Sequence, residues 1–359
     1  MSRKLLSYTA IGLILGNTAI ADVPKVAVDI APVHSLVSRV MEGVGSPKLI
    51  IPAGASPHEY SLRPSEAKSL QDADMVIWMG EDLAPWMENS IETLSKNAEV
   101  ITLLEESGTK LLDFREGALF EEHDHGDHDD HDDHDHDKDH DDHDDHDDHG
   151  HDKDHDDHDD HDKDHDDHDD HDKDHDDHDD HGDHDGHAHG EHDPHAWLSI
   201  ENAQTWLNLV AGKLSASDPE NAGVYFANAA AAREEINDLV KEVNSILEPV
   251  RGRNFVVFHD AYQYFETSFD FPAAGAISLG DATDPSAARI AEIQDRVKDE
   301  GINCVLSEPQ FNANLVATVL SGTDAKTGVI DPLGLGLEPG PKLYGDLIRN
   351  MGKALAGCL

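Results

Sequence analysis

The chain has 359 residues, two cysteines and a formal net charge of −51. Residues 123–193 account for most of this charge, because they hold 36 Asp, one Glu and only four Lys. A chain this acidic lacks the basic face that nucleic-acid binding requires, so we expect no nucleic-acid partner. The remaining residues suffice for two ordinary domains of about 100–150 residues each.

The N-terminus has the pattern of an export signal. Arg3 and Lys4 precede a mostly apolar run, Leu5–Ile20, and Ala19-Ile20-Ala21 is a small–x–small cleavage site. We predict a signal peptide over residues 1–21, cleaved after Ala21, and therefore a periplasmic protein. No second run approaches the roughly 20 apolar residues that a membrane-spanning helix needs.

The two cysteines, Cys304 and Cys358, allow one disulfide pairing, which an exported protein permits. The bridge would tie the extreme C-terminus to the body of the last domain. Two buried free thiols are the alternative. A structural zinc site is disfavoured because it usually takes four Cys or His ligands.

Residues 123–193 form a low-complexity segment, here called the His/Asp segment. It contains 24 of the 28 histidines and four copies of the decamer HDKDHDDHDD. Because it cannot bury enough apolar surface to offset the entropy of ordering, we predict a disordered loop. Its role is either that of a solvated acidic segment that aids solubility or that of a low-affinity, multi-site metal store beside a tighter site.

Short strand-like runs alternate with helical stretches on both sides of the His/Asp segment. Before it lie the predicted strands Lys25–Ile30, Lys48–Ile51, Asp74–Trp78 and Val100–Leu104 and the predicted helix Ser65–Gln71. After it lie the predicted strands Phe255–Phe258, Ile302–Leu306 and Gly328–Ile330 and a predicted helix from Asp284 to Glu300. This alternation is typical of α/β proteins with mostly parallel sheets.

A single long helix is predicted between the two α/β regions. Asp218-Pro219 is a helix start, and Gly223 is the only breaker before Pro249. At 1.5 Å per residue this helix is roughly 45 Å long. We therefore predict two α/β lobes joined by one long rigid helix: an N-terminal lobe over residues 22–217, a linking helix over 218–248 and a C-terminal lobe over 249–359.

Outside the His/Asp segment only four histidines remain: His34, His58, His195 and His259. His58 and His259 follow predicted strands, as does Asp331, and ligands of α/β sheets bind beyond the carboxyl ends of strands. His195 lies where the His/Asp segment ends. His34 starts an amphipathic helix, so we expect it to be structural.

One such histidine alone is more often a hydrogen-bonded loop or core residue than a ligand. Three together, in a chain with a His-rich segment, indicate a metal site. Three neutral imidazoles and one oxygen ligand describe tetrahedral zinc, whereas manganese or iron would more naturally take a second carboxylate in place of one His. We predict a Zn²⁺ site made by His58, His195, His259 and Asp331.

Five motifs are shared with one family of receptors: GASPHEY at 54–60, DPHAWLS at 193–199, FHDAY at 258–262, SEPQ at 307–310 and DPLG at 331–334. Through them the chain resembles the periplasmic zinc-binding receptors of high-affinity zinc-uptake ABC transporters, over essentially the whole mature chain. The resemblance implies two lobes bridged by a rigid helix, zinc in the cleft, and delivery of the ion to an inner-membrane permease. It also implies a disulfide, because related receptors bridge two cysteines placed like Cys304 and Cys358.

By that resemblance His58, His195 and His259 are the ligands. Some relatives use an acidic residue just before the first of these histidines, but Pro57 occupies that position here. The fourth ligand is therefore Asp331 or a water molecule.

Two other functions are open to the same residues. A manganese or iron receptor of the same fold is one, and a zinc hydrolase is the other, because an open fourth position on zinc can activate water. The chain has no His-Glu-x-x-His motif, and Glu59 is the only candidate for a general base beside a ligand. We therefore predict that the protein is not an enzyme, and we expect a monomer.

Overall fold

The computed structural model describes residues 23–115, 120, 192–278, 285–310 and 313–359. By its internal contacts the chain divides into a unit of residues 1–122 and 188–359 and a second unit of residues 123–187. The predicted signal peptide and nearly all of the His/Asp segment lie outside the described residues.

The first sheet has four parallel strands in the order β2-β1-β3-β4. Their bounds are β1 Val26–Val28, β2 Lys48–Leu49, β3 Met75–Trp78 and β4 Glu99–Thr102, and the connecting helices are α1 Ala31–Val40, α2 Pro64–Gln71 and α3 Pro85–Leu94. Both α2 and α3 begin with proline, whose fixed φ suits the first helical turn. Every residue of β1 and β3 is buried, as expected for the central strands of a parallel sheet covered on both faces.

The second sheet repeats this pattern, with four parallel strands in the order β6-β5-β7-β8. Its strands are β5 Phe255–His259, β6 Ala276–Ser278, β7 Cys304–Ser307 and β8 Lys326–Val329, and its helices are α6 Gln263–Phe269, α7 Ala287–Asp299, α8 Ala313–Val319 and α9 Leu343–Cys358. Helix α9 packs against α5 (Ala222–Leu247), α1 and β8. The disulfide Cys304–Cys358 joins its last turn to β7, which confirms the expected pairing.

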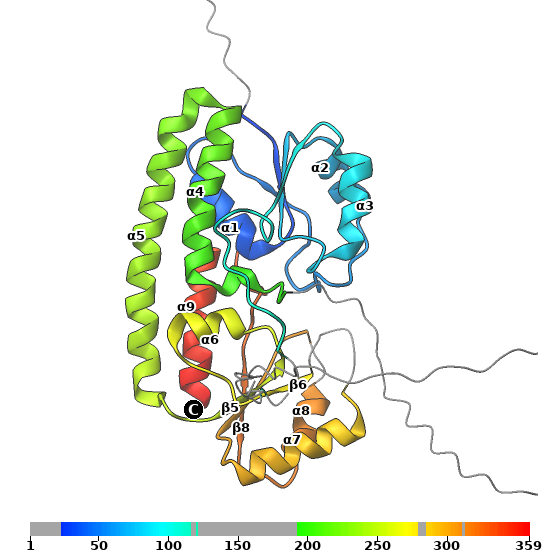
Figure 1. The fold of residues 1–359 in the computed structure, drawn as a ribbon, viewed down its shortest axis with the longest axis vertical. Helices are drawn as coiled ribbons and strands as arrows, with labels where there is room; N and C mark the ends of the chain where they lie inside the picture. The colour runs from blue at the N-terminus through cyan, green and yellow to red at the C-terminus, as the bar shows by residue number, and fades with distance from the viewer. Residues whose placement is uncertain (1–22, 116–119, 121–191, 279–284, 311–312) are drawn as a thin grey trace, which may run out of the picture. The chain divides into compact units, whose positions relative to one another are not determined.

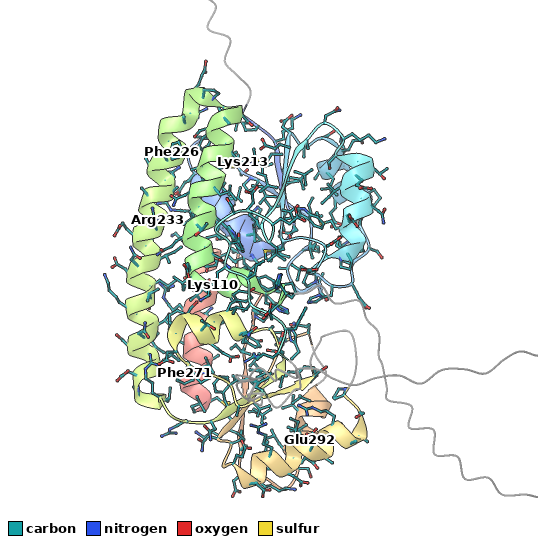
Figure 2. The ribbon with its side chains drawn as sticks, in the orientation of Figure 1. Lys110, Lys213, Phe226, Arg233, Phe271 and Glu292 are labelled. Atoms are coloured by element: carbon teal, nitrogen blue, oxygen red, sulfur yellow. A yellow bond between two sulfur atoms is a disulfide. The ribbon has the colours of Figure 1, made fainter. Side chains whose placement is uncertain are left out.

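Two long helices connect the sheets, α4 Ile200–Ser217 and α5, and they lie side by side (Figure 1). Lys213 of α4, labelled in Figure 2, is ion-paired with Glu99 of β4 at 2.9 Å. Helix α5 ends just before a 3₁₀ turn, Glu248–Val250. Two parallel sheets and one long helix confirm the predicted fold class. No helix in the described ranges is both long enough and apolar enough to cross a membrane.

The start of α5 differs from the expectation. A 3₁₀ turn, Pro219–Asn221, precedes the α-helix, and the Asp218 side chain accepts no backbone N–H as a helix cap. Its carboxylate instead accepts hydrogen bonds from Asn221 Nδ2 at 2.7 Å and from the Tyr225 hydroxyl at 2.8 Å. Asp218 therefore fixes the turn between α4 and α5 through side chains.

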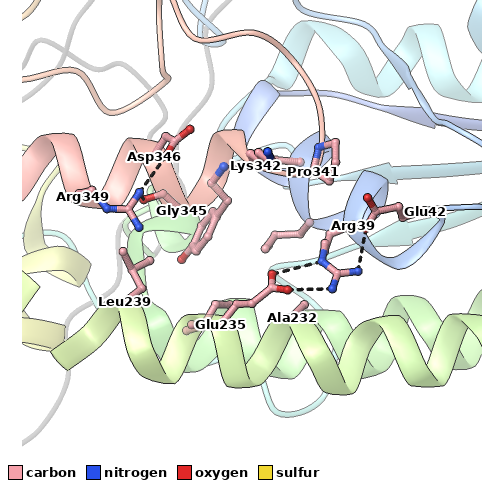
Figure 3. A pocket seen from close by; sticks show the side chains of 14 residues that line it. Arg39, Glu42, Ala232, Glu235, Leu239, Pro341, Lys342, Gly345, Asp346 and Arg349 are labelled. Atoms are coloured by element: carbon pink, nitrogen blue, oxygen red, sulfur yellow. Dashed lines mark hydrogen bonds and ion pairs between the residues drawn. The ribbon is translucent and has the colours of Figure 1, made fainter. Parts of the chain in front are cut away.

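Helices α1, α5 and α9 meet around a groove of about 420 Å³ (Figure 3). Arg39 of α1 pairs there with Glu235 of α5 at 2.8 Å. Arg349 of α9 pairs with Glu242, also on α5, at 2.8 Å. The linking helix is thus ion-paired with a helix of each sheet region, although such partly exposed pairs each contribute only about 0–1 kcal/mol.

Asp29, directly after β1, is a fully buried carboxylate. Its Oδ1 accepts from the Ile30 N–H and its Oδ2 from the Met79 N–H, both at 2.7 Å, so it ties the end of β1 to the end of β3. Burial raises the pKa of Asp29 to about 7, and the backbone donors act in the opposite direction. A carboxyl group whose pKa is raised on folding stabilises the fold fully only below its unfolded pKa of 3.8, and that contribution is lost as the pH rises through about 7.

We expect Asp29→Asn to remove this pH dependence. The amide has one acceptor oxygen for two N–H donors, which costs about 1–3 kcal/mol. The stability difference between wild type and variant should narrow by roughly 2–3 kcal/mol between pH 5 and pH 8, because the contribution of Asp29 is lost over this range and is present only in wild type. Urea unfolding of the metal-free proteins at both pH values tests this; a difference that widens with pH would contradict it.

Candidate metal site

The structure brings the side chains of three predicted ligands next to one another. His58 lies in the loop after β2, His195 precedes the short turn η1 (Ala196–Leu198), and His259 is the last residue of β5. The ring centroids of His58 and His195 are 5.5 Å apart, and those of His195 and His259 are 5.3 Å apart. Two imidazoles on one tetrahedral zinc have centroids about 5 Å apart, because each Zn–N bond is about 2.0–2.1 Å. The ring spacing fits such a site.

The ligating atoms are not yet gathered around one point. Across the described ranges, no group of three or more His, Cys, Asp or Glu side chains has the spacing of a bound metal ion. The His195 ring is the neighbour of both the His58 ring and the His259 ring. His195 is the central ring of the three.

Two buried carboxylates hold two of these imidazoles. Asp193 Oδ1 lies 2.7 Å from His195 Nδ1 and also accepts the His195 backbone N–H at 2.9 Å. Glu308 Oε1 is hydrogen-bonded to His259 Nδ1, and Gln310 Nε2 donates to its other oxygen at 2.7 Å. An ionised carboxylate only accepts hydrogen bonds, so each ring donates through Nδ1–H. In that tautomer Nε2 carries the lone pair with which a neutral imidazole binds a metal.

Removing either carboxylate should weaken metal binding without removing a ligand. We expect Asp193→Ala and Glu308→Ala each to lower zinc affinity about 10- to 100-fold, because a ring without its partner loses orientation and basicity. Chelator competition measures the zinc affinity. Glu235→Ala is the control, because it also removes a carboxylate, but one that lines the groove of Figure 3 and is paired with Arg39. Affinities within twofold of wild type would show that these carboxylates do not support the site.

Hydrogen bonds to residues of the first sheet region hold the loop that carries His58. Trp86 Nε1 donates to the Pro57 carbonyl at 2.8 Å, and the His58 backbone N–H donates to Ser56 Oγ at 3.2 Å. Gly54 has φ +86°, and a Cβ at this position would lie 2.7 Å from Leu335 Cδ1. The positive φ favours glycine, and without a Cβ at this position the His58 loop lies against Leu335 in the loop that follows Asp331.

Asp331, the fourth predicted ligand, is held by its own loop. Its Oδ1 accepts the N–H groups of Leu333 at 3.0 Å and Gly334 at 2.9 Å. Trp197 Nε1 donates to the Pro332 carbonyl at 2.8 Å, which joins this loop to the turn that follows His195. Burial raises the pKa of Asp331. The backbone N–H groups of Leu333, Gly334 and Leu335 act in the opposite direction.

His34 lies apart from these rings, inside α1. Its Nε2 is 3.3 Å from the Pro47 carbonyl and its Nδ1 is 3.4 Å from Ser38 Oγ. Burial lowers its pKa, which favours the neutral ring. It has the surroundings of a structural histidine, as expected.

No role was predicted for Asp193 or Glu308, although both lie in motifs that the sequence shares with the receptor family. The sequence could have indicated Asp193, because it is two residues before the predicted ligand His195. It could also have indicated Glu308, because Glu308 follows β7, the neighbour of the strand that ends in His259. A carboxylate at the carboxyl end of a strand adjacent to a ligand strand is the signal that points to such a partner.

Two parallel sheets connected by a long helix, with the His195 ring next to those of His58 and His259, suit a metal-binding solute receptor. A family model described as "Zinc-uptake complex component A periplasmic" matches residues 26–358. The chain therefore belongs to the ZnuA family, in agreement with the resemblance of its motifs.

Curated relatives agree along nearly the whole chain. The high-affinity zinc uptake system protein ZnuA of Brucella abortus (strain 2308) is 44% identical over 344 residues, which is 96% of this chain and 94% of that protein. ZnuA of Paracoccus denitrificans is 44% identical over 349 residues, covering 96% and 95% of the two chains.

Solved structures share the fold. A crystal structure of ZnuA matches with a TM-score of 0.65 at 18% identity, covering 94% of this chain and 99% of that one. The zinc-bound ZnuA-like domain of Streptococcus pneumoniae AdcA matches with a TM-score of 0.60 at 22% identity, covering 93% and 98%.

Proposed function

We propose that the protein is a periplasmic receptor that captures Zn²⁺ and passes it to the permease of an ABC transporter. The observation that carries this proposal is the row of three adjacent imidazoles. Two of them, His195 and His259, are buried, and a carboxylate is hydrogen-bonded to Nδ1 of each of these two rings. The ligands are His58, His195 and His259, with Asp331 or a water molecule in the fourth position. The names of the relatives support both the metal and the transport role.

Zinc suits this ligand set better than manganese or iron. Neutral imidazole is a ligand of borderline softness that zinc accepts readily in tetrahedral sites, whereas manganese favours carboxylate and carbonyl oxygens. In this site the nearby carboxylates Asp193 and Glu308 are engaged with imidazole nitrogens. The metal would therefore meet mostly nitrogen.

The test is a competition titration of zinc and manganese, on the full chain and on a variant lacking residues 123–190. This deletion retains His192 and Asp193. We expect one tight zinc per chain in the variant, poorly displaced by manganese, and further weak zinc binding in the full chain. Manganese that displaces zinc at equal concentration would disprove the zinc assignment. Loss of the tight site on deletion would disprove the role of the His/Asp segment as a separate store.

Asp331→Asn distinguishes a carboxylate ligand from water. The amide oxygen can still accept the two loop N–H groups, but the negative charge is gone. We expect zinc affinity to fall about tenfold or more if Asp331 is the fourth ligand, since even outer-sphere partners contribute that much. Unchanged affinity would assign the fourth position to water.

We also propose that the protein is a monomer without catalytic activity or nucleic-acid affinity, exported by a signal peptide cleaved after Ala21. The receptor role of the family supports the absence of catalysis. Asp193 and Glu308 support it as well, because both carboxylates are hydrogen-bonded to imidazoles, which leaves them poorly suited to act as a general base. Zinc-dependent turnover of ester or phosphate substrates would contradict it. Mass spectrometry of the exported protein tests the cleavage site.

A further inference from the structure

Arg115 is paired with two buried carboxylates, one of which directly follows a proposed ligand. Its Nε donates to the two oxygens of Asp260 at 3.1 and 3.0 Å, and its Nη2 is bonded to the same carboxylate. Its Nη1 and Nη2 donate to Glu266 at 2.8 and 3.1 Å. Both carboxylates are only 5% exposed. Asp260 is the residue after His259, so this guanidinium is fixed to the chain at the metal site.

Arg115 is the cationic partner of two buried carboxylates. A buried carboxylate without a cationic partner is strongly destabilising. Asp260 and Glu266 are both buried and both ion-paired with the guanidinium, so Arg115 stabilises them in the interior, next to the residue that carries the proposed ligand His259.

The backbone around Arg115 is fixed beside Asp193. The Asp193 N–H donates to the Leu112 carbonyl at 2.8 Å, and Asp113 and His192 form an antiparallel bridge. The Tyr264 hydroxyl accepts the Leu112 N–H at 2.9 Å and donates to the Asp193 carbonyl at 3.0 Å. Residues 112–115 and 192–193, here called the neck, thus pair where the chain leaves for the His/Asp segment and returns from it.

We propose that Arg115 is a positioning residue for the metal site, which holds the neck and Asp260 together and through them orients the imidazoles of His195 and His259. This inference rests on the proposed function, because its effect is on zinc binding. Arginine is required because its planar fork reaches two carboxylates at once, which the single ammonium of lysine cannot do with the same geometry. The Phe120 ring lies against the guanidinium, with its centroid 3.5 Å from Arg115 Cζ, which adds a cation–π contact.

A purely structural ion pair would behave differently. It would lower the stability of the fold and leave the affinity of the folded protein for zinc unchanged. A positioning residue changes affinity and coordination geometry under conditions in which the variant is fully folded. Arg39 is the matched control, because it also pairs with carboxylates, Glu42 and Glu235, but in the groove of Figure 3.

The experiment compares Arg115→Met, Arg115→Lys and Arg39→Met in the full chain. We measure the affinity for the first equivalent of zinc by chelator competition, and the visible spectrum of the first equivalent of cobalt(II). Arg115→Met should weaken zinc about tenfold and alter the cobalt spectrum. Arg115→Lys should give an intermediate loss, and Arg39→Met should match wild type in both measurements. Adding Asp260→Asn to Arg115→Met should cause little further loss, because both changes break the same link.

Wild-type zinc affinity and cobalt spectrum in Arg115→Met would overturn the proposal, whatever the change in unfolding midpoint. If Arg115→Met does not fold, Arg115→Lys decides: unchanged affinity in that variant overturns the proposal, and weakened affinity supports it. A wild-type protein without tight zinc would overturn the proposed function and this inference together. Tight zinc in wild type with no effect at Arg115 would overturn only the inference.

Discussion

Replacing His195 with alanine should weaken zinc binding by at least about 100-fold, the largest loss among the three histidines. Losing a ligand should cost more than the 10- to 100-fold that loss of an outer partner typically costs. His195 is 5% exposed, its ring lies between the other two, and Asp193 fixes its Nδ1. His58 is only partly buried, so we expect its replacement to be the mildest of the three.

His34→Ala is the matched control for this prediction. It also removes a buried imidazole, but one that contacts Pro47 and Ser38 inside α1. We expect it to lower the unfolding midpoint and leave zinc affinity unchanged. Chelator competition on the folded variants gives the comparison. Equal losses for His34→Ala and His195→Ala would mean that zinc affinity reports general destabilisation rather than ligation.

Removing the disulfide should have the largest effect on stability. The bridge links residues 54 positions apart, and loop-closure entropy alone assigns it about 4 kcal/mol, within the range of about 2–5 kcal/mol typical for native disulfides. It also fixes the last turn of α9, which packs on α5 and β8. We expect Cys304→Ala/Cys358→Ala to reduce the free energy of unfolding by this amount in urea titrations.

Zinc affinity should survive that loss. Cys304 begins β7 and Glu308 follows its other end, about 13 Å away at 3.3 Å per residue. Wild type in reducing agent should reproduce the stability of the double variant, which separates loss of the bridge from loss of side-chain volume. A double variant as stable as oxidised wild type would show that α9 is held by packing alone.

The sequence predicted those strands and helices that have a clear local signal. The apolar runs of both sheets, and the end of α5 before Pro249, follow from strand periodicity and from proline. Helices α3, α4, α6, α8 and α9 and strand β6 were not predicted. The signal for α9 was present, since Leu343, Leu347, Met351 and Leu355 recur every fourth residue and all are buried.

The candidate site was predictable to the extent that its residues follow strands. His58 and His259 were found in this way, and the structure places both beside His195. The pairing of Arg115 with Asp260 and Glu266 was not predictable, because these residues are separated by 145 and 151 positions. No periodicity links them; only the folded chain brings the neck to α6.

The pairing of residues in the neck bears on how the length of the His/Asp segment can change during evolution. Asp113 and His192, which flank residues 114–191, form a β-bridge, so the length of the chain between them does not alter the distance that it must span. Closing a flexible loop costs only about 0.6 kcal/mol more for each doubling of its length. Copies of the decamer could therefore be gained or lost by replication slippage with little effect on folding. The number of imidazoles in the segment could then vary between strains while His58, His195 and His259 stay constant.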